Sequence, residues 1–363
     1  GAVTLVSAKD VGINAAFTAA SLTQQAGTGT TTIGAATTLA GALSFTGSAL
    51  TVNAAVTTGG AVTVVNAGAF TTIAAGDITA AGAFSQTGAG TNSLAGDISL
   101  TSSSAALGFA TAVTLTGNVV FSTTNGAMTF AEVVDGTADD TQNLTLNAGS
   151  GDVTFAKALG AVKTLGDVAA NSTGATKFQG AVLAKSLTTN VGGSTELSAD
   201  VTTTATQVFN DMVVLTGGVT LTGTDITLAQ TVNSDATGTK RALTVTGSGV
   251  TTFGGAVGGT VALASLTVNG GGTALLNGGA VTTSGAQSYA DAVTLGANTA
   301  LVTTDSNVGF TSTLNSSEAL ATAVPAAPAT LSITAGAGDV TFGAIVGGAT
   351  YTATNGALGA VTL

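Results

Sequence analysis

Residues 144–155 read LTLNAGSGDVTF, and this short alternating pattern recurs along the chain. Residues 331–342 read LSITAGAGDVTF, identical at eight of the twelve positions, and residues 243–253 give the related LTVTGSGVTTF. In an extended chain the leucine, valine and phenylalanine side chains point to one side and the threonines to the other, while the glycine-rich AGSG supplies a turn. The pattern predicts two strands joined by a turn, and its recurrence indicates a repeat array.

A second set of residues supports the repeat array because it recurs with constant internal spacing. Its copies are Phe109, Val113 and Leu115, then Phe209, Val213 and Leu215, then Tyr289, Val293 and Leu295. The approximate modules are a divergent 1–142, then 143–241, 242–329 and a partial 330–363. Residues 315–329 contain both prolines of the chain, so we expect an inserted loop or a short helix there.

Two all-β folds could use such strands. One is a right-handed parallel β-helix running continuously over residues 1–363, with about 18 coils at roughly 20 residues each. The alternative is a string of immunoglobulin-like β-sandwiches, since a module of roughly 90 residues also suits that domain. The missing Trp, the scarcity of proline and the repetition inside each module favour the β-helix. Its expected inward residues include Leu144, Val153, Phe155, Leu243, Phe253, Leu331 and Phe342.

The composition excludes several functions. A formal net charge of -11 argues against nucleic acid as a partner. No uninterrupted apolar stretch reaches the roughly 18 residues of a membrane-spanning helix. The chain has no His and no Cys, which removes Ser-His-Asp and Cys-His nucleophiles and the usual zinc ligands. We therefore expect a protein that is not an enzyme and has no cofactor.

The densest acidic group is AEVVDGTADD, with Glu132, Asp135, Asp139 and Asp140. Paired carboxylates could serve acid-base chemistry, but no aromatic platform for a sugar ring accompanies them. Carboxylate oxygens also suit calcium. The group is interpreted first as a solvated acidic loop and second as a calcium site.

A second acidic pattern is Gly-Asp followed by Val or Ile. Because the tandem nonapeptide of a calcium β-roll is absent, we expect these aspartates to accept backbone hydrogen bonds where a turn leads into a strand. Calcium ligation is the alternative. The pattern occurs at Asp77, Asp97, Asp152, Asp167 and Asp339.

Residues 247–295, GSGVTTFGGAVGGTVALASLTVNGGGTALLNGGAVTTSGAQSYADAVTL, resemble the repeats of very large bacterial surface proteins of the β-strand-repeat or filamentous-haemagglutinin-like type. The resemblance extends from about residue 107 to 348 and is weaker before it. It implies a secreted or surface-attached β-solenoid that serves as an adhesin, stalk or matrix fibre. No catalytic motif comes with it.

The pentapeptide GAVTL occurs at both ends, as Gly1, Ala2, Val3, Thr4 and Leu5 and as Gly359, Ala360, Val361, Thr362 and Leu363. Both copies read as ordinary strands without a charged cap, so we expect terminal coils that pair with those of another copy. The rival explanation is excision from a longer chain.

The sequence therefore predicts an extracellular or cell-surface structural protein that polymerises head to tail into a fibre, sheath or surface layer. The alternative is an adhesin passenger that binds surface glycans or a host protein.

Overall fold

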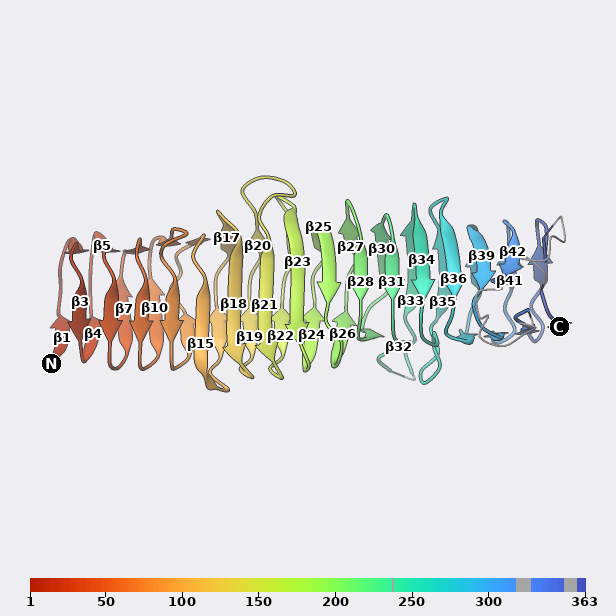
Figure 1. The fold of residues 1–363 in the computed structure, drawn as a ribbon, viewed down its shortest axis with the longest axis horizontal. Helices are drawn as coiled ribbons and strands as arrows, with labels where there is room; N and C mark the ends of the chain where they lie inside the picture. The colour runs from red at the N-terminus through yellow and green to blue at the C-terminus, as the bar shows by residue number, and fades with distance from the viewer. Residues whose placement is uncertain (237, 318–327, 349–357) are drawn as a thin grey trace. The chain divides into compact units, whose positions relative to one another are not determined.

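The computed structural model describes residues 1–236, 238–317, 328–348 and 358–363. It is an all-β parallel β-solenoid of about 15 turns with a repeat of roughly 21 residues, and none of the described residues forms a helix. The turns group into two units, Gly1–Lys185 and Ser186–Leu363. Figure 1 shows successive turns of each unit as neighbouring strands.

Most turns of unit 1 contribute one strand to each of three parallel sheets, and the turn between β22 and β23 has only an isolated bridge at Leu159 in the second position. The first sheet contains β1 (Ala2–Leu5), β4 (Ser21–Gln24), β7 (Leu43–Gly47), β10 (Val62–Asn66), β13 (Phe84–Gln86), β16 (Leu107–Phe109), β19 (Met128–Phe130), β22 (Val153–Phe155) and β24 (Ala175–Phe178). The second contains β2 (Val11–Ile13), β5 (Thr30–Ile33), β8 (Ala49–Val52), β11 (Phe70–Thr72), β14 (Asn92–Leu94), β17 (Val113–Leu115) and β20 (Val134–Asp135). The third contains β3 (Phe17–Ala19), β6 (Thr37–Leu39), β9 (Val56–Thr58), β12 (Ile78–Ala80), β15 (Ile98–Ser103), β18 (Val119–Thr124), β21 (Leu144–Gly149) and β23 (Leu165–Ser172).

Unit 2 repeats this plan. Its first series is β26 (Ser194–Leu197), β29 (Met212–Leu215), β32 (Val232–Ser234), β37 (Ala280–Thr282), β40 (Thr299–Val302), β43 (Leu331–Thr334) and β45 (Val361–Thr362). Its second is β27 (Val201–Thr203), β30 (Val219–Gly223), β33 (Ala242–Gly247), β35 (Ser265–Asn269), β38 (Gln287–Tyr289), β41 (Val308–Phe310) and β44 (Val340–Phe342). Its third is β28 (Gln207–Phe209), β31 (Ile226–Leu228), β34 (Val250–Phe253), β36 (Thr273–Leu276), β39 (Ala292–Leu295) and β42 (Leu314–Ser316), preceded by residues 187–189 of β25 (Val182–Thr189).

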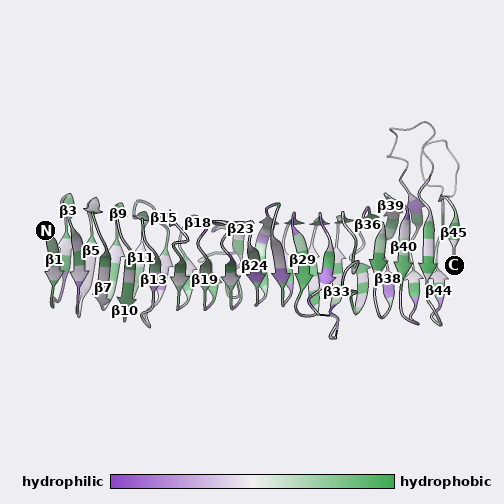
Figure 2. Ribbon diagram, turned by 90° about the horizontal axis from the view of Figure 1, so that it is seen from below, coloured by the Kyte–Doolittle hydropathy of each residue, from purple (hydrophilic) through white to green (hydrophobic). Residues whose placement is uncertain are grey.

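The core of each unit is a set of side-chain stacks, because parallel in-register strands place equivalent residues directly above one another. Phe130, Phe155 and Phe178 stack with ring centroids 4.8 and 5.6 Å apart. Hydrophobic residues occur on strands throughout both units (Figure 2). Residues that alternate with them, such as Thr145 and Thr154, lie on the outer side of the strands, although several other threonines are buried.

The predicted parallel β-helix is confirmed, because every strand pair given a register is parallel, whereas a β-sandwich is antiparallel. The coil handedness stays a prediction. Phe342 is among the residues predicted to face inward, but it is only partly buried. It stacks on Phe310 at 5.5 Å, and among the described strands β44 pairs only with β41. The other expected inward residues are all buried: Leu144, Val153, Phe155, Leu243, Phe253 and Leu331.

The number of turns is about 15, so the predicted count of about 18 is wrong. That count takes one constant coil length, whereas the coils differ in length: Ala2 pairs with Ser21, Met128 with Val153 and Thr299 with Leu331, separations of 19, 25 and 32 residues. The longest separation contains the predicted insertion 315–329. Residues 318–327 of that insertion lie outside the described residues, and the module boundaries stay predictions.

Candidate functional site

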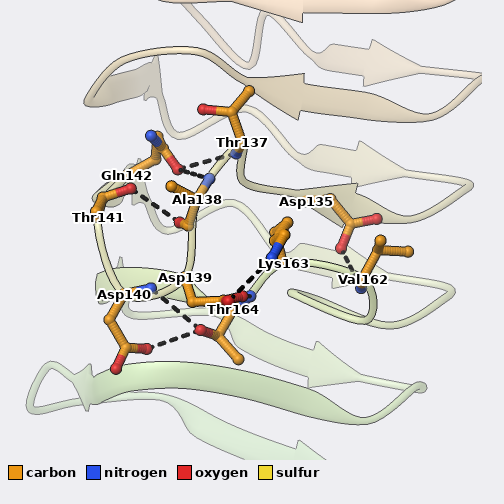
Figure 3. Close-up of polar contacts among 10 residues, drawn as sticks. All are labelled: Asp135, Thr137, Ala138, Asp139, Asp140, Thr141, Gln142, Val162, Lys163 and Thr164. Atoms are coloured by element: carbon orange, nitrogen blue, oxygen red, sulfur yellow. Dashed lines mark hydrogen bonds and ion pairs between the residues drawn. The ribbon is translucent and has the colours of Figure 1, made fainter.

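Of the predicted acidic group, Glu132 precedes β20, Asp135 lies on β20, and Asp139 and Asp140 lie in the loop that leads to β21; Figure 3 shows these three aspartates. Asp139 Oδ2 forms an ion pair with Lys163 Nζ at 3.0 Å, and its Oδ1 accepts a hydrogen bond from the Thr164 backbone N-H at 3.1 Å. The hydrogen bond from Lys163 and the Thr164 N-H hold the pKa of Asp139 below its usual value. The Asp139 carboxylate therefore connects its own turn to the next one through an ion pair and a hydrogen bond.

The neighbouring carboxylates make similar contacts. Asp135 Oδ1 accepts the Val162 N-H at 3.0 Å, and Asp140 Oδ1 accepts the Thr164 hydroxyl at 2.8 Å. Glu132 is exposed. Within the described ranges no three acidic, His or Cys side chains come together in a group that could hold a metal ion. The calcium site at these residues stays a prediction, while the observed contacts join the loop to the following turn.

The Gly-Asp pattern connects turns in the same way. Asp77 Oδ1 accepts the Asp97 N-H at 2.9 Å, and Asp97 Oδ1 accepts the Val120 N-H at 2.8 Å. Asp152 Oδ1 accepts the Ala175 N-H at 2.9 Å, which together with Lys177 lowers the pKa of Asp152. The predicted role of these aspartates, accepting a backbone hydrogen bond where a turn leads into a strand, is seen in these three cases. In these three cases the donor belongs to the next coil, about one repeat further along the chain.

The other two members of the pattern differ. Asp167 Oδ2 lies 3.5 Å from Lys185 Nζ, and the backbone N-H of Asp167 donates to Asn143 Oδ1 at 2.8 Å. The Asp339 N-H donates to Asn307 Oδ1 at 2.8 Å. Asn143 and Asn307 therefore fill the acceptor position that aspartate fills elsewhere. A carbonyl oxygen on a short side chain is what this position requires.

The two copies of GAVTL lie on β1 and on β45 with its flanking residues. Val3 pairs with the buried Leu22, and Val361 pairs with the buried Leu331, so the valine of each copy faces inward. Ala2 and Thr4 are exposed, whereas Val3 and Leu5 are only partly covered. Val361 is 43% and Leu363 is 74% exposed. Among the described strands, β1 pairs only with β4 and β45 only with β43, which leaves one edge of each without a partner strand.

Two buried aspartates, Asp211 and Asp291, were missed by the sequence reasoning. Asp211 is only 2% exposed, and its Oδ1 accepts hydrogen bonds from the hydroxyls of Thr189 at 2.9 Å and Thr195 at 2.7 Å. Its Oδ2 has no hydrogen-bond partner among the described residues. Burial raises the pKa of Asp211. A signal was present, because Asp211 follows Phe209 in the repeated anchor as Asp291 follows Tyr289.

Polar side chains also occur inside unit 1, where alternation predicts apolar ones. Gln86 Nε2 donates to Asn66 Oδ1 at 2.8 Å and to the Gly88 carbonyl at 2.7 Å, and both side chains are buried. Asn92 Nδ2 donates to the Ala112 carbonyl at 3.0 Å. Hydrogen bonding offsets the cost of placing these amides in the core. The network is structural and offers no reactive group.

No protein-family model, curated protein or solved structure matches this chain. The described residues contain no helix with the length and hydropathy needed to cross a membrane. The strand pairing by itself defines the class of the protein, a parallel β-solenoid. The likeness to bacterial surface repeats remains a likeness of sequence pattern.

Proposed function

We propose that this chain is an extracellular, non-enzymatic structural protein whose end turns stack on those of other copies to form a fibre, sheath or surface layer. The likeness to bacterial surface repeats supports the location. The chain's lack of His and Cys supports a structural role, because it lacks the side chains of common nucleophilic and zinc sites.

The observation that carries the proposal is the matching inward phase of the two end strands. Val3 and Leu5 on β1 alternate inward, and Val361 on β45 faces inward over Leu331. A parallel strand added to either edge must keep this phase, because a shift of one residue would turn its apolar side chains outward. The first turn of one copy can therefore lie on the last turns of another and continue both the ladder and the core.

The surface near β45 also suits a covering turn. Ile333, Val340 and Leu363 are among the residues lining an open pocket of about 400 Å³. Leu363 is 74% exposed, and Val340 and Phe342 are partly exposed, so these three apolar side chains offer surface that a stacked turn would bury, whereas Ile333 is already buried. The contact would be heterologous, since the edge of β1 differs from the edges of β44 and β45, and a heterologous contact that does not close gives a filament.

The proposal is tested by placing a charge on each side of β45. Val361→Asp places a carboxylate at the inward position, which the next copy would bury without a partner, so we expect loss of filaments. Thr362→Asp is the matched control, because Thr362 pairs with the exposed Ser332 on the outward side. Both variants should keep the circular-dichroism spectrum of the unmodified protein. Normal filaments from Val361→Asp would place the joint elsewhere.

A further inference from the structure

Unit 2 contains a pocket beside Asp211. It is open to solvent, has a volume of about 420 Å³, and is lined in part by Val191, Asp211, Met212 and Gln230. Val191 is 70% and Met212 is 42% exposed, so two apolar side chains flank a buried acid. Exposed apolar groups beside a buried polar group are typical of small-ligand sites.

The hydrogen bonds around Asp211 leave one carboxylate oxygen unused. Each hydroxyl of Thr189 and Thr195 has a single proton, and both protons are donated to Oδ1. Oδ2 is buried and has no donor, and if it were protonated it would have no acceptor among the described residues. Neither charge state of the carboxyl satisfies this atom, and an unsatisfied buried oxygen costs free energy.

None of the ion pairs among the described residues includes Asp211. When the carboxyl is ionised, the missing partner of Oδ2 is a hydrogen-bond donor, and a positive charge on that donor would also offset the burial of the carboxylate.

We propose that this pocket binds a primary ammonium group on a short aliphatic chain, with the ammonium on Asp211 Oδ2 and the chain between Val191 and Met212. Lysine side chains and free alkylamines share this chemistry. Because Oδ2 is covered in the structure, binding needs a small local movement. The pocket wall includes Gly192 and Gly193, which have φ of 92° and 115° and carry no side chain to obstruct the approach.

Asp291 provides an internal comparison. It occupies the equivalent repeat position, is also buried, and its Oδ2 likewise has no partner within the part of the chain that the structure describes. Its Oδ1 accepts the Gly271 N-H at 2.8 Å. Val268 and Ala274 pair with Tyr289 and Val293, at the places where Thr189 and Thr195 pair with Phe209 and Val213. Ala292 stands in place of Met212, so the apolar rim is reduced beside Asp291.

The test is a calorimetric titration of the purified protein at neutral pH with butylammonium chloride, with butanol as the uncharged control. We expect saturable binding of butylammonium, none of butanol, and binding at least roughly tenfold weaker in Asp211→Asn, equivalent to about 1.4 kcal/mol. Asp291→Asn should bind like the unmodified protein. Met212→Ser should weaken binding of butylammonium but not of methylammonium, which lacks the aliphatic chain.

A second arm uses Nα-acetyl-lysine methylamide to distinguish the two sources. Binding tighter than that of butylammonium assigns the pocket to a lysine of a protein partner, and weaker binding assigns it to a free amine. Absence of saturable binding by either probe would mean that only water satisfies Oδ2, and would overturn the proposal. Equal binding by Asp211→Asn, with an unchanged circular-dichroism spectrum, would also overturn it.

Discussion

An inward side chain in this solenoid contacts the equivalent side chains of the turns on either side. Phe155 lies between Phe130 and Phe178, and all three rings are nearly parallel, with interplanar angles of 10° and 1°. Removing one ring from such a stack leaves a cavity with two walls that cannot easily close, since each neighbour is held by its own strand.

Phe155→Ala should therefore destabilise the protein by about 3–5 kcal/mol, because it deletes a buried ring and creates a cavity. Thr154→Ala, next to it on the outward side of β22, should change stability by less than about 0.5 kcal/mol. Thermal unfolding followed by circular dichroism measures both. Equal melting temperatures for the two variants would show that the Phe155 ring does not contribute to the core.

The next prediction concerns Asp211 and the pH dependence of folding stability. Burial raises the pKa of this carboxyl in the folded protein, whereas in the unfolded chain it ionises at its ordinary, lower value. Its contribution to stability is thus lost as pH rises from the unfolded pKa through the folded pKa. Asp211→Asn removes this titration. The stability of the variant relative to the unmodified protein should increase as the pH rises above the ordinary aspartate pKa of about 3.9, and a difference that does not change with pH would contradict the account.

At the scale of strands and corners, the recurring device is an Asp or Asn that accepts a backbone N-H from the following turn. Asp97 takes part on both sides, since its N-H donates to Asp77 and its carboxylate accepts from Val120. The backbone changes direction at such corners, and its N-H groups there need side-chain acceptors. Hydrogen bonds to side chains therefore connect the corners of successive turns, as backbone hydrogen bonds connect their strands.

Asp97→Ala should cost about 1 kcal/mol, by analogy with the loss of a helix N-cap acceptor, whereas Asp97→Asn keeps an acceptor oxygen and should cost less. Amide hydrogen exchange gives a local measurement. The Val120 amide should exchange faster in Asp97→Ala than in Asp97→Asn. If both variants exchange at the rate of the unmodified protein, the side chain is not the protecting acceptor.

The strands and their inward faces could be predicted because alternation is a local property. Leu144, Val153 and Phe155 show it within twelve residues of sequence. Turn number could not be predicted, because coil length changes through loops that carry no periodic signal. The acceptor role of Asp97 was predictable from residue type, but its partner 23 residues away depends on register between turns.

The buried acid at Asp211 could not be recognised from alternation. It lies between β28 and β29, where the chain turns a corner and the inward or outward direction is set by local backbone geometry. Only the recurrence of Asp at 211 and 291 in the anchor could have indicated it. The acidic loop was predicted as a group, yet Asp135, Asp139 and Asp140 each accept hydrogen bonds from residues 162–164 on the next turn.

At the scale of the whole molecule, both units are stacks of turns that each bury the inner face of the next. Stability in such a stack is approximately a sum of turn and interface terms, so the first and last turns gain the most from any added turn. The end strands β1 and β45 carry the inward valines that such a turn would cover.

The most direct measurement is sedimentation velocity of the unmodified 363-residue protein over a wide concentration range, with electron micrographs of the same samples. The account predicts that larger species accumulate with rising concentration and appear in the micrographs as unbranched filaments of constant width. A single species with the 34.2 kDa mass of one chain at every concentration would contradict it.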